Sequence, residues 1–329
     1  ELYRKHPEEA RDSFGEDPFE VKNILKYWVF SEKPEFHVIP TDTINIHIDK
    51  DALLRSGIML PKTIRHLKGE DLKDAIPDKL YIPLTDIRML TKVDLLMLEM
   101  LANCNWERPL YLAISVGSVS KLKFDNYFVQ EGLAFRFTPF DYKKWGDVGE
   151  NRLYAVDVER LYDNVMNRYK YGGLDTPGLY LDETTLRTCW YHRRLFAQLA
   201  KELIAQGDNE RAKKVLAYAE QVIPGYNVPE THESGSYDIA TAYAALGEKT
   251  KAVTLAVHLI AEAEDYINWA FSLKGNRIEM VRNDCIYKFW QWNQYNELLK
   301  KIDGEKYKES NRQFEEKYAL FAPTMNYKN

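Results

Sequence analysis

The segment Asn105-Trp106-Glu107-Arg108-Pro109 combines residue types that bind polar ligands. It falls where a predicted helix gives way to a predicted strand, and loop side chains at such junctions often carry function. The ring of Trp106 offers a large flat surface and the guanidinium of Arg108 offers several donors, so the two could line a cleft. They could also cover the helix end and bind its carbonyl groups, and we favour this structural role.

A second polar segment runs from Leu161 to Gly173. In a helix, Asp163, Asn164 and Asn167 fall on one side, because residues at positions i, i+1 and i+4 lie close together. Amides and a carboxylate on one face can hold sugar hydroxyls or a peptide backbone. They can equally tie the helix to a neighbouring part of the protein, which is the interpretation we favour.

No complete catalytic constellation accompanies these segments. The sequence contains no GxGxxG, P-loop, GxSxG or HExxH motif, and its seven histidines show no spacing typical of metal ligands. The three cysteines, Cys104, Cys189 and Cys285, are far apart, and we interpret them as structural thiols rather than as a disulfide framework. We therefore predict no catalytic residue, no metal and no cofactor for this chain.

The charge composition of the chain limits the classes of partner that it could bind. The 329 residues carry 45 basic and 50 acidic side chains, a net charge of −5, and the basic residues are scattered. A nucleic-acid partner would require a basic surface, so we exclude it. No apolar run reaches the ~18 residues that indicate a membrane span. The chain begins with Glu1 in a highly charged stretch, and we expect it to be a part of a longer polypeptide.

Residues 1–175 are predicted to form an α/β domain. Residues 43–49 alternate strictly, with isoleucines on one face and polar residues such as Asn45 on the other, which predicts a half-buried strand. A second short strand is expected at 79–82. Further along the chain we expect helical turns at 124–131, a strand at 133–137 and a helix at 157–170 that ends at Gly172-Gly173.

A helix beginning at Thr91 is the clearest element of this domain. Thr91 can cap it while Asp94 reaches back to the cap, and leucines and methionines cover most of its circumference, so we expect burial on nearly all sides. The apolar run 110–116 predicts a central strand covered on both faces. With strand 79–82, these elements predict a right-handed βαβ crossover in a mixed sheet.

Residues 176–329 have a helical period almost throughout, which predicts an all-α domain. Helices are expected at 182–206, 209–223, 236–246 and 248–264, with further helix to about residue 302. The pattern Gly207-x4-Ala212 recurs 40 residues later as Gly247-x4-Ala252, and its alanines would let two helices approach closely. We interpret the region as a tetratricopeptide-like helical repeat.

Several collinear motifs resemble those of one known family. They are Asn105-Trp106-Glu107-Arg108-Pro109-Leu110-Tyr111, Tyr127 with Glu131-Gly132-Leu133-Ala134-Phe135-Arg136, Tyr162-Asp163-Asn164-Val165-Met166-Asn167 with Gly172-Gly173, and Tyr180-x-Asp182-Glu183. With them, residues 15–225 resemble the C-terminal soluble region of a bacterial membrane-protein family common in Bacteroidetes, formerly catalogued as a domain of unknown function. That family is similar to the eukaryotic transmembrane O-mannosyltransferase that modifies plexin-type receptor domains.

The resemblance implies a cellular context. Members of the family have an N-terminal half of many membrane spans and a soluble tail outside the cytoplasmic membrane. The chain would then be a periplasmic tail, attached to the inner membrane through spans that are absent here. Because the catalytic carboxylate of such transferases lies in the membrane half, the resemblance places no catalytic residue on this chain. The candidate binding residues are Trp106, Arg108, Glu131, Asp163, Asn164 and Asn167.

Three functions remain open from the sequence. The chain could be an accessory domain that binds or orients an acceptor protein or peptide during protein O-glycosylation, and we favour this hypothesis. It could instead be a protein-interaction scaffold in the cell envelope with no role in sugar transfer. It could also be a stand-alone enzyme with a cleft between its halves, which we rank last.

Overall fold

In the computed structural model the chain divides into two compact units, Glu1–Asp157 and Val158–Asn329. The structure describes residues 14–34, 37–116, 124–148, 154–273 and 277–325, with the single residues 8, 12 and 122. Short strands and helices make up the first unit, and the second unit is built from helices. The predicted fold class, a mixed strand-and-helix region followed by an all-helical region, is therefore confirmed. The division by contacts falls at residue 157, whereas the sequence suggested a boundary at residue 175.

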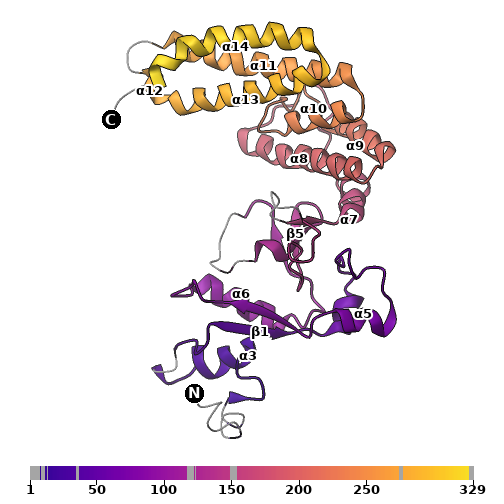
Figure 1. Cartoon of the computed structure of the whole chain (residues 1–329), viewed down its shortest axis with the longest axis vertical. Coiled ribbons are helices and arrows are strands. Elements are labelled where there is room, and N and C mark those ends of the chain that lie inside the picture. The colour runs from indigo at the N-terminus through magenta and orange to yellow at the C-terminus, as the bar shows by residue number, and fades with distance from the viewer. Residues whose placement is uncertain are drawn as a thin grey trace. The chain divides into compact units, whose positions relative to one another are not determined.

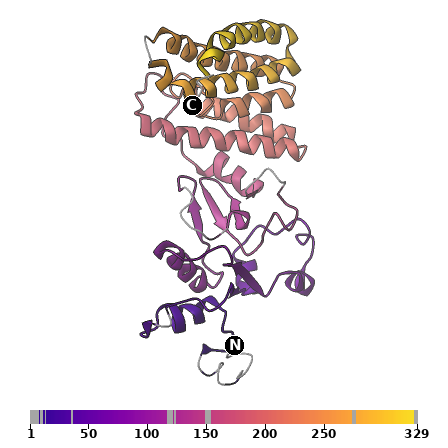
Figure 2. The ribbon, with the colours of Figure 1, turned by 60° about the vertical axis from the view of Figure 1, so that its left-hand side comes forward.

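The strands of the first unit form two separate sheets, β1-β2 and β3-β5-β4-β6. Magenta arrows in Figure 2 mark the four-stranded sheet. The elements are α3 (Val21–Ile24), the π-helical turn η1 (Leu25–Val29), β1 (Thr43–His47), α4 (Lys50–Arg55), α5 (Gly69–Ala75), β2 (Lys79–Pro83), α6 (Lys92–Asn103), β3 (Tyr111–Ala113), the 3-10 turn η3 (Asp125–Tyr127), β4 (Phe128–Gln130), β5 (Ala134–Phe137) and β6 (Ala155–Val156). The strand predicted at 133–137 is thus confirmed. The helical turns predicted at 124–131 are reduced to η3, because the residues that follow pair with β5 as strand β4.

Strand β1 pairs antiparallel with β2, from Thr43 opposite Pro83 to His47 opposite Lys79. Its isoleucines are buried as predicted, but Asn45 is buried too, with 4% of its surface exposed. The polar face of β1 is covered because the preceding segment crosses it. The backbone N–H of Asn45 donates to the Phe19 carbonyl at 2.8 Å. The prediction of an open polar face at Asn45 was therefore wrong.

Helix α6 begins as the sequence predicts. Thr91 Oγ1 accepts from the backbone N–H of Asp94 at 3.3 Å, and Asp94 Oδ2 accepts from the backbone N–H of Thr91 at 2.7 Å, which completes a capping box. The expected burial on nearly all sides was wrong. Leu98 and Leu101 enter the core, but a stripe consisting of Val93, Leu96 and Met100 is exposed.

The run 110–116 does not form a central strand. Only Tyr111–Ala113 is extended, and this strand, β3, lies at the edge of the second sheet, antiparallel to β5. Strands β2 and β3 therefore belong to different sheets, and the predicted crossover through α6 is absent from the described residues. A continuous apolar run does not by itself establish a central strand, and in β3 the side chains of Tyr111 and Ala113 are exposed.

The second unit consists of helical hairpins. Its elements are α7 (Val158–Asp163), the π-helical turn η4 (Asn164–Arg168), α8 (Glu183–Ala205), α9 (Asn209–Val222), α10 (Ser236–Ala245), α11 (Lys249–Ser272), α12 (Arg277–Met280), α13 (Arg282–Ile302) and α14 (Gly304–Met325). The helices predicted between residues 157 and 264 are all present. Helix α11 extends beyond its predicted end, and α14 was not predicted.

These helices pack in sequential pairs, α8 with α9, α10 with α11, and α13 with α14, while α10 also contacts α8 and α11 contacts α13. Figure 1 shows α11, α13 and α14 side by side. Ala212 and Ala252 are fully buried, as the repeat predicted. The three cysteines are buried free thiols, also as predicted. Among the residues described, no helix is sufficiently long and apolar for a membrane span.

Candidate functional site

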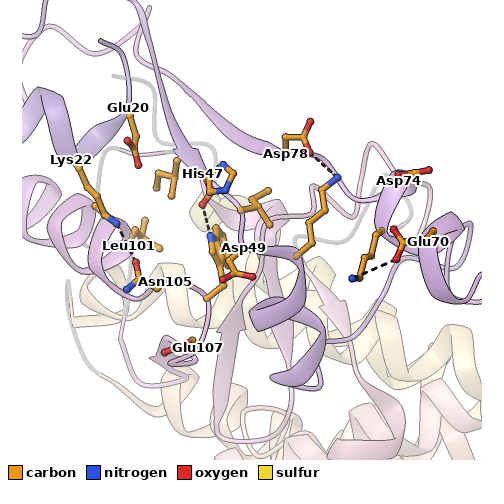
Figure 3. Close-up of a pocket in the computed structure, with 16 residues that line it drawn as sticks. Glu20, Lys22, His47, Asp49, Glu70, Asp74, Asp78, Leu101, Asn105 and Glu107 are labelled. Atoms are coloured by element: carbon orange, nitrogen blue, oxygen red, sulfur yellow. Dashed lines mark hydrogen bonds and ion pairs between the residues drawn. The ribbon is translucent and has the colours of Figure 1, made fainter. Parts of the chain in front are cut away.

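The first unit contains a surface cavity of about 670 Å³, which we call the acidic cavity. The end of β1 and the start of α4 form its centre, with α3 and the end of α6 on one side and α5 on the other (Figure 3). Its polar lining residues are Glu20, Lys22, His47, Asp49, Lys50, Glu70, Lys73, Asp74, Asp78, Asn105 and Glu107.

The segment that follows α6 forms one wall of the acidic cavity. Trp106 is 6% exposed, and its Nε1–H donates to the carbonyl of His47 at 2.7 Å. Lys22 Nζ donates to Asn105 Oδ1 at 3.1 Å, and both bonds are drawn in Figure 3. Trp106 therefore lines the cavity and joins the end of α6 to β1, but it donates to a strand carbonyl and not to the carbonyls of the helix end.

The backbone at this wall is strained. Asn105 has φ 48° and Trp106 has φ 60°, and they are the non-glycine residues with positive φ in the described chain. Asparagine tolerates this region, but for a bulky side chain it costs on the order of 1–3 kcal/mol. The Trp106 ring is held in place by stacking on Phe137 at 6.3 Å and by its bond to His47. Strain that is imposed by packing in this way fixes the shape of the cavity wall.

Negative charge predominates in the acidic cavity, because its lining contains six carboxylates and three lysines. Some of these charges are paired. Lys50 Nζ lies 2.7 Å from Asp78, and this hydrogen bond lowers the pKa of the Asp78 carboxyl. Lys73 lies 2.8 Å from Asp51 outside the lining, and that bond raises the pKa of the Lys73 amine.

Other carboxylates of the acidic cavity are available to a ligand. In the described part of the chain, Glu20, Asp74 and Glu107 take part in no ion pair. Asp49 instead caps α4, where its side chain accepts from the backbone N–H of Ala52 at 2.9 Å. Among described residues, no group of three or more His, Cys, Asp or Glu side chains could hold a metal ion. The arrangement is suited to binding a ligand that provides positive charge or several hydrogen-bond donors.

Two other predicted residues of the first unit lie outside the acidic cavity. Arg108 is exposed and borders a narrow pocket that Arg136 also lines. Glu131 is buried, accepts from the Tyr111 hydroxyl at 2.8 Å and lies 3.6 Å from Arg136. Arg136 in turn donates to the carbonyl of Ser56 at 3.0 Å. Glu131 therefore belongs to a buried network that joins the second sheet to the end of α4.

The remaining predicted residues belong to the second unit. Asn167 Nδ2 donates to Asp163 Oδ1 at 3.0 Å, so the two side chains meet on one face as the helical spacing predicted. Arg168 also pairs with Asp163 at 2.6 Å. The hydrogen bond with Asn167 is the main cause that lowers the pKa of Asp163. Asn164, which begins η4, is partly buried.

Sequence reasoning missed most of the acidic cavity. The strict alternation of residues 43–49 did place His47 and Asp49 on one face of β1, and this was a usable signal. Lys22, Glu70 and Asp78 could not be grouped with them, because only the fold brings these distant segments together.

Comparison with known families bears on the same region. Residues 5–159 match the family model described as TMEM260-associated domain 2. The match supports a TMEM260-like domain in the first unit. It spans the whole lining of the acidic cavity, from Glu20 to Glu107. Neither the curated proteins nor the solved structures provide a match to the chain.

Proposed function

We propose that the chain is the periplasmic, soluble part of a multi-spanning membrane protein that resembles a glycosyltransferase. In this proposal it assists protein O-glycosylation by binding or orienting the acceptor protein. The observation that carries the proposal is the match of residues 5–159 to a TMEM260-associated domain. Membrane attachment would be provided by spans outside this sequence.

The acidic cavity is the site that we assign to the acceptor. An extended polypeptide supplies backbone N–H donors and, where it contains lysine or arginine, positive charge. The unpaired carboxylates Asp74 and Glu107 would attract such a segment, and Trp106 provides a fixed wall. Electrostatic attraction of this kind increases the rate of association and favours one orientation of the bound chain.

The test uses the full-length parent protein in its membrane. Asp74 and Glu107 are exposed, so replacing both by lysine should leave the fold intact while reversing the charge of the acidic cavity. We expect the variant to glycosylate its acceptor at least about fivefold more slowly, measured as the glycosylated fraction of acceptor peptides by mass spectrometry.

A matched control replaces two exposed acids of the same unit that lie outside the cavity, Asp71 and Asp125, by lysine. This control has the same change in net charge and should glycosylate normally. Deletion of residues 1–329 from the parent should abolish or redirect modification. Normal glycosylation by the deletion protein would contradict the proposal.

The helical hairpins of the second unit favour a second candidate, an interaction scaffold in the cell envelope. Arrays of this type commonly present extended surfaces to protein partners. Under this alternative, the deletion would leave the glycan status of all envelope proteins unchanged, whereas affinity purification of the parent would lose a defined partner complex.

A further inference from the structure

Helix α13 exposes two large aromatic side chains that lie against each other. The rings of Tyr287 and Trp290 are 5.6 Å apart with an interplanar angle of 11°, and they are 44% and 49% exposed. On the same helix, Trp292 and Tyr295 are completely buried. Trp292 and Tyr295 therefore pack in the core of the second unit, whereas Tyr287 and Trp290 remain accessible to a ligand.

The loop between α9 and α10 faces this pair and is held rigidly. The buried guanidinium of Arg193 donates to the carbonyls of Ile223, Val228 and Pro229 and to Ser234 Oγ, at distances of 2.6 to 3.0 Å. Such a network fixes the path of the loop before any ligand arrives.

The last turn of this loop lies directly against α8. Arg194 Nε donates to the carbonyl of Glu233 at 2.6 Å. Gly235, with φ 86°, lies so close to α8 that a Cβ atom there would be 2.9 Å from Arg194 Cγ. Any other residue would therefore push the loop away from α8, and glycine keeps His232 and Glu233 in position.

His232 is packed among the aromatic rings. Its ring stacks on Tyr237 at 5.7 Å, and it meets Tyr287 and Trp290 edge-on at 6.1 Å and 5.6 Å. His232 Nδ1 is 2.9 Å from the hydroxyl of Tyr295. The other ring nitrogen, Nε2, has no hydrogen-bond partner in the described chain and is not among its buried unpaired atoms. In either tautomer of the neutral ring, Nε2 can make one hydrogen bond with a hydroxyl group.

The carboxylate of Glu233 lies beside this ring. Burial would raise its pKa, but the backbone N–H of Glu233, Lys288 and Gln291 together lower the pKa, so the group stays ionised near neutral pH. Gln291 Nε2 donates to Glu233 Oε1 at 3.0 Å. Gln291 is completely buried, and its Oε1 has no donor in the described chain. Gln291 therefore holds the Glu233 carboxylate in a fixed position.

The charges around Glu233 nearly balance, which limits the class of ligand. Lys288 Nζ lies 3.1 Å from Glu262, and the positively charged Arg194 is bound to the loop backbone. A strongly basic peptide would meet these two cations at close range. A purely apolar peptide would gain nothing from the fixed carboxylate and imidazole.

We infer that His232, Glu233, Tyr237, Tyr287 and Trp290, which we call the aromatic shelf, bind a neutral saccharide. The C–H face of a hexose ring would stack on the exposed rings of Trp290 and Tyr287, and its hydroxyls would donate to the Glu233 carboxylate and bond with His232 Nε2. Fixed acceptors beside a flat aromatic surface match the two kinds of surface that a sugar presents. This site lies entirely within the second unit, and the inference does not depend on the acceptor-binding role proposed for the acidic cavity.

The experiment measures binding of free sugars to the full 329-residue chain by saturation-transfer NMR, with methyl glycosides of mannose, glucose and galactose and the corresponding disaccharides as probes. Affinity is then measured by titration of tryptophan fluorescence. We expect at least one probe to bind, and Trp290→Ala and Glu233→Gln each to weaken that binding at least about tenfold. Circular dichroism verifies that both variants fold.

Trp269→Ala provides a matched control, because Trp269 is 48% exposed on the neighbouring helix α11 and, among the described rings, contacts only that of Tyr266. This variant should bind the sugar with unchanged affinity. Absence of saturation transfer for every probe would refute the inference, as would binding that Trp290→Ala leaves intact. Binding of a lysine-rich or apolar peptide at the aromatic shelf without any sugar binding would also refute it. Because acceptor glycosylation by the Asp74 and Glu107 variants is measured separately, either proposal can fail alone.

Discussion

Replacing Arg193 should destabilise the second unit more than any exposed substitution on the same helix. The guanidinium makes four hydrogen bonds, and three of them are to backbone carbonyls at the end of α9 and in the loop between α9 and α10, of which those of Ile223 and Val228 are buried. In Arg193→Met, a chain of similar length fills most of the volume but provides no donor. The three carbonyls then lose this donor, while the Ser234 hydroxyl keeps its bonds to Thr231 and Ser236.

The expected loss of unfolding free energy is the difference between the hydrogen bonds that are lost and the desolvation cost that is relieved. Four hydrogen bonds from a charged donor contribute about 6–8 kcal/mol at about 1.5–2 kcal/mol each. Burial lowers the pKa of Arg193 to about 10, which corresponds to a desolvation cost of about 3 kcal/mol for the charged group. The substitution should therefore lower the free energy of unfolding by about 3–5 kcal/mol. Arg193→Lys should fall between wild type and Arg193→Met, because a single ammonium cannot reach all four acceptors.

Urea denaturation followed by far-ultraviolet circular dichroism is a suitable assay, because α8–α14 contribute most of the helical signal. Arg187→Met is the control, since Arg187 is an exposed residue of the same helix that pairs with Glu183 four positions earlier. Its effect should be within about 0.5 kcal/mol. If Arg193→Met loses no more stability than Arg187→Met, the hydrogen-bond reasoning is wrong.

Two further predictions concern the packing of Trp106 and the buried histidines. Trp106→Ala should lower the stability of the first unit by about 3–5 kcal/mol, whereas Trp106→Phe, which keeps a ring but loses the donor to His47, should cost only about 1–2 kcal/mol. Hydrogen exchange of β1 amides measures both effects, and a Trp106→Phe variant as stable as the wild type would show that the bond to His47 contributes nothing. Burial lowers the pKa of His192 and of His232, so the unfolded chain binds protons before the folded one does. The second unit should therefore lose stability as the pH falls from about 7 to about 5, and His192→Gln with His232→Gln should flatten this dependence of the melting temperature. An unchanged slope in the double variant would contradict the assignment.

The sequence was informative where structure depends on near neighbours. The capping box at Thr91 and Asp94 and the helices α8 to α11 depend on residues within one or two turns, and all were predicted. Helix α14 was missed because its apolar residues are sparse. Its rings Phe314, Tyr318 and Phe321 are at helical spacing and pack against Phe289 of α13, but charged residues fill most of the positions between them.

Features that depend on distant segments could not be predicted. The burial of Asn45 depends on the segment that contains Phe19, which crosses the polar face of β1. The edge position of β3 depends on which strand pairs with it, and this is not encoded in its apolar run. Of the residues that line the acidic cavity, only Trp106 was named in advance as a binding residue, with Asn105 and Glu107 in the same segment, because the other carboxylates come from distant stretches of chain.

The hydrogen bonds that join the elements of the first unit connect residues far apart in the sequence, whereas the helices of the second unit pack mainly on their neighbours in the sequence. Arg136 reaches Ser56 across 80 residues, and Trp106 reaches His47 across 59, whereas each helical hairpin joins consecutive elements. Closing long loops costs more chain entropy and slows folding. The first unit leaves the ribosome earlier, but it folds more slowly because its contacts join distant residues. The helical hairpins of the second unit can therefore form while β1 and β2 are still unpaired. During that interval the second unit is folded while the first unit still exposes its unpaired strands. We therefore expect chaperones to bind mainly to the first unit.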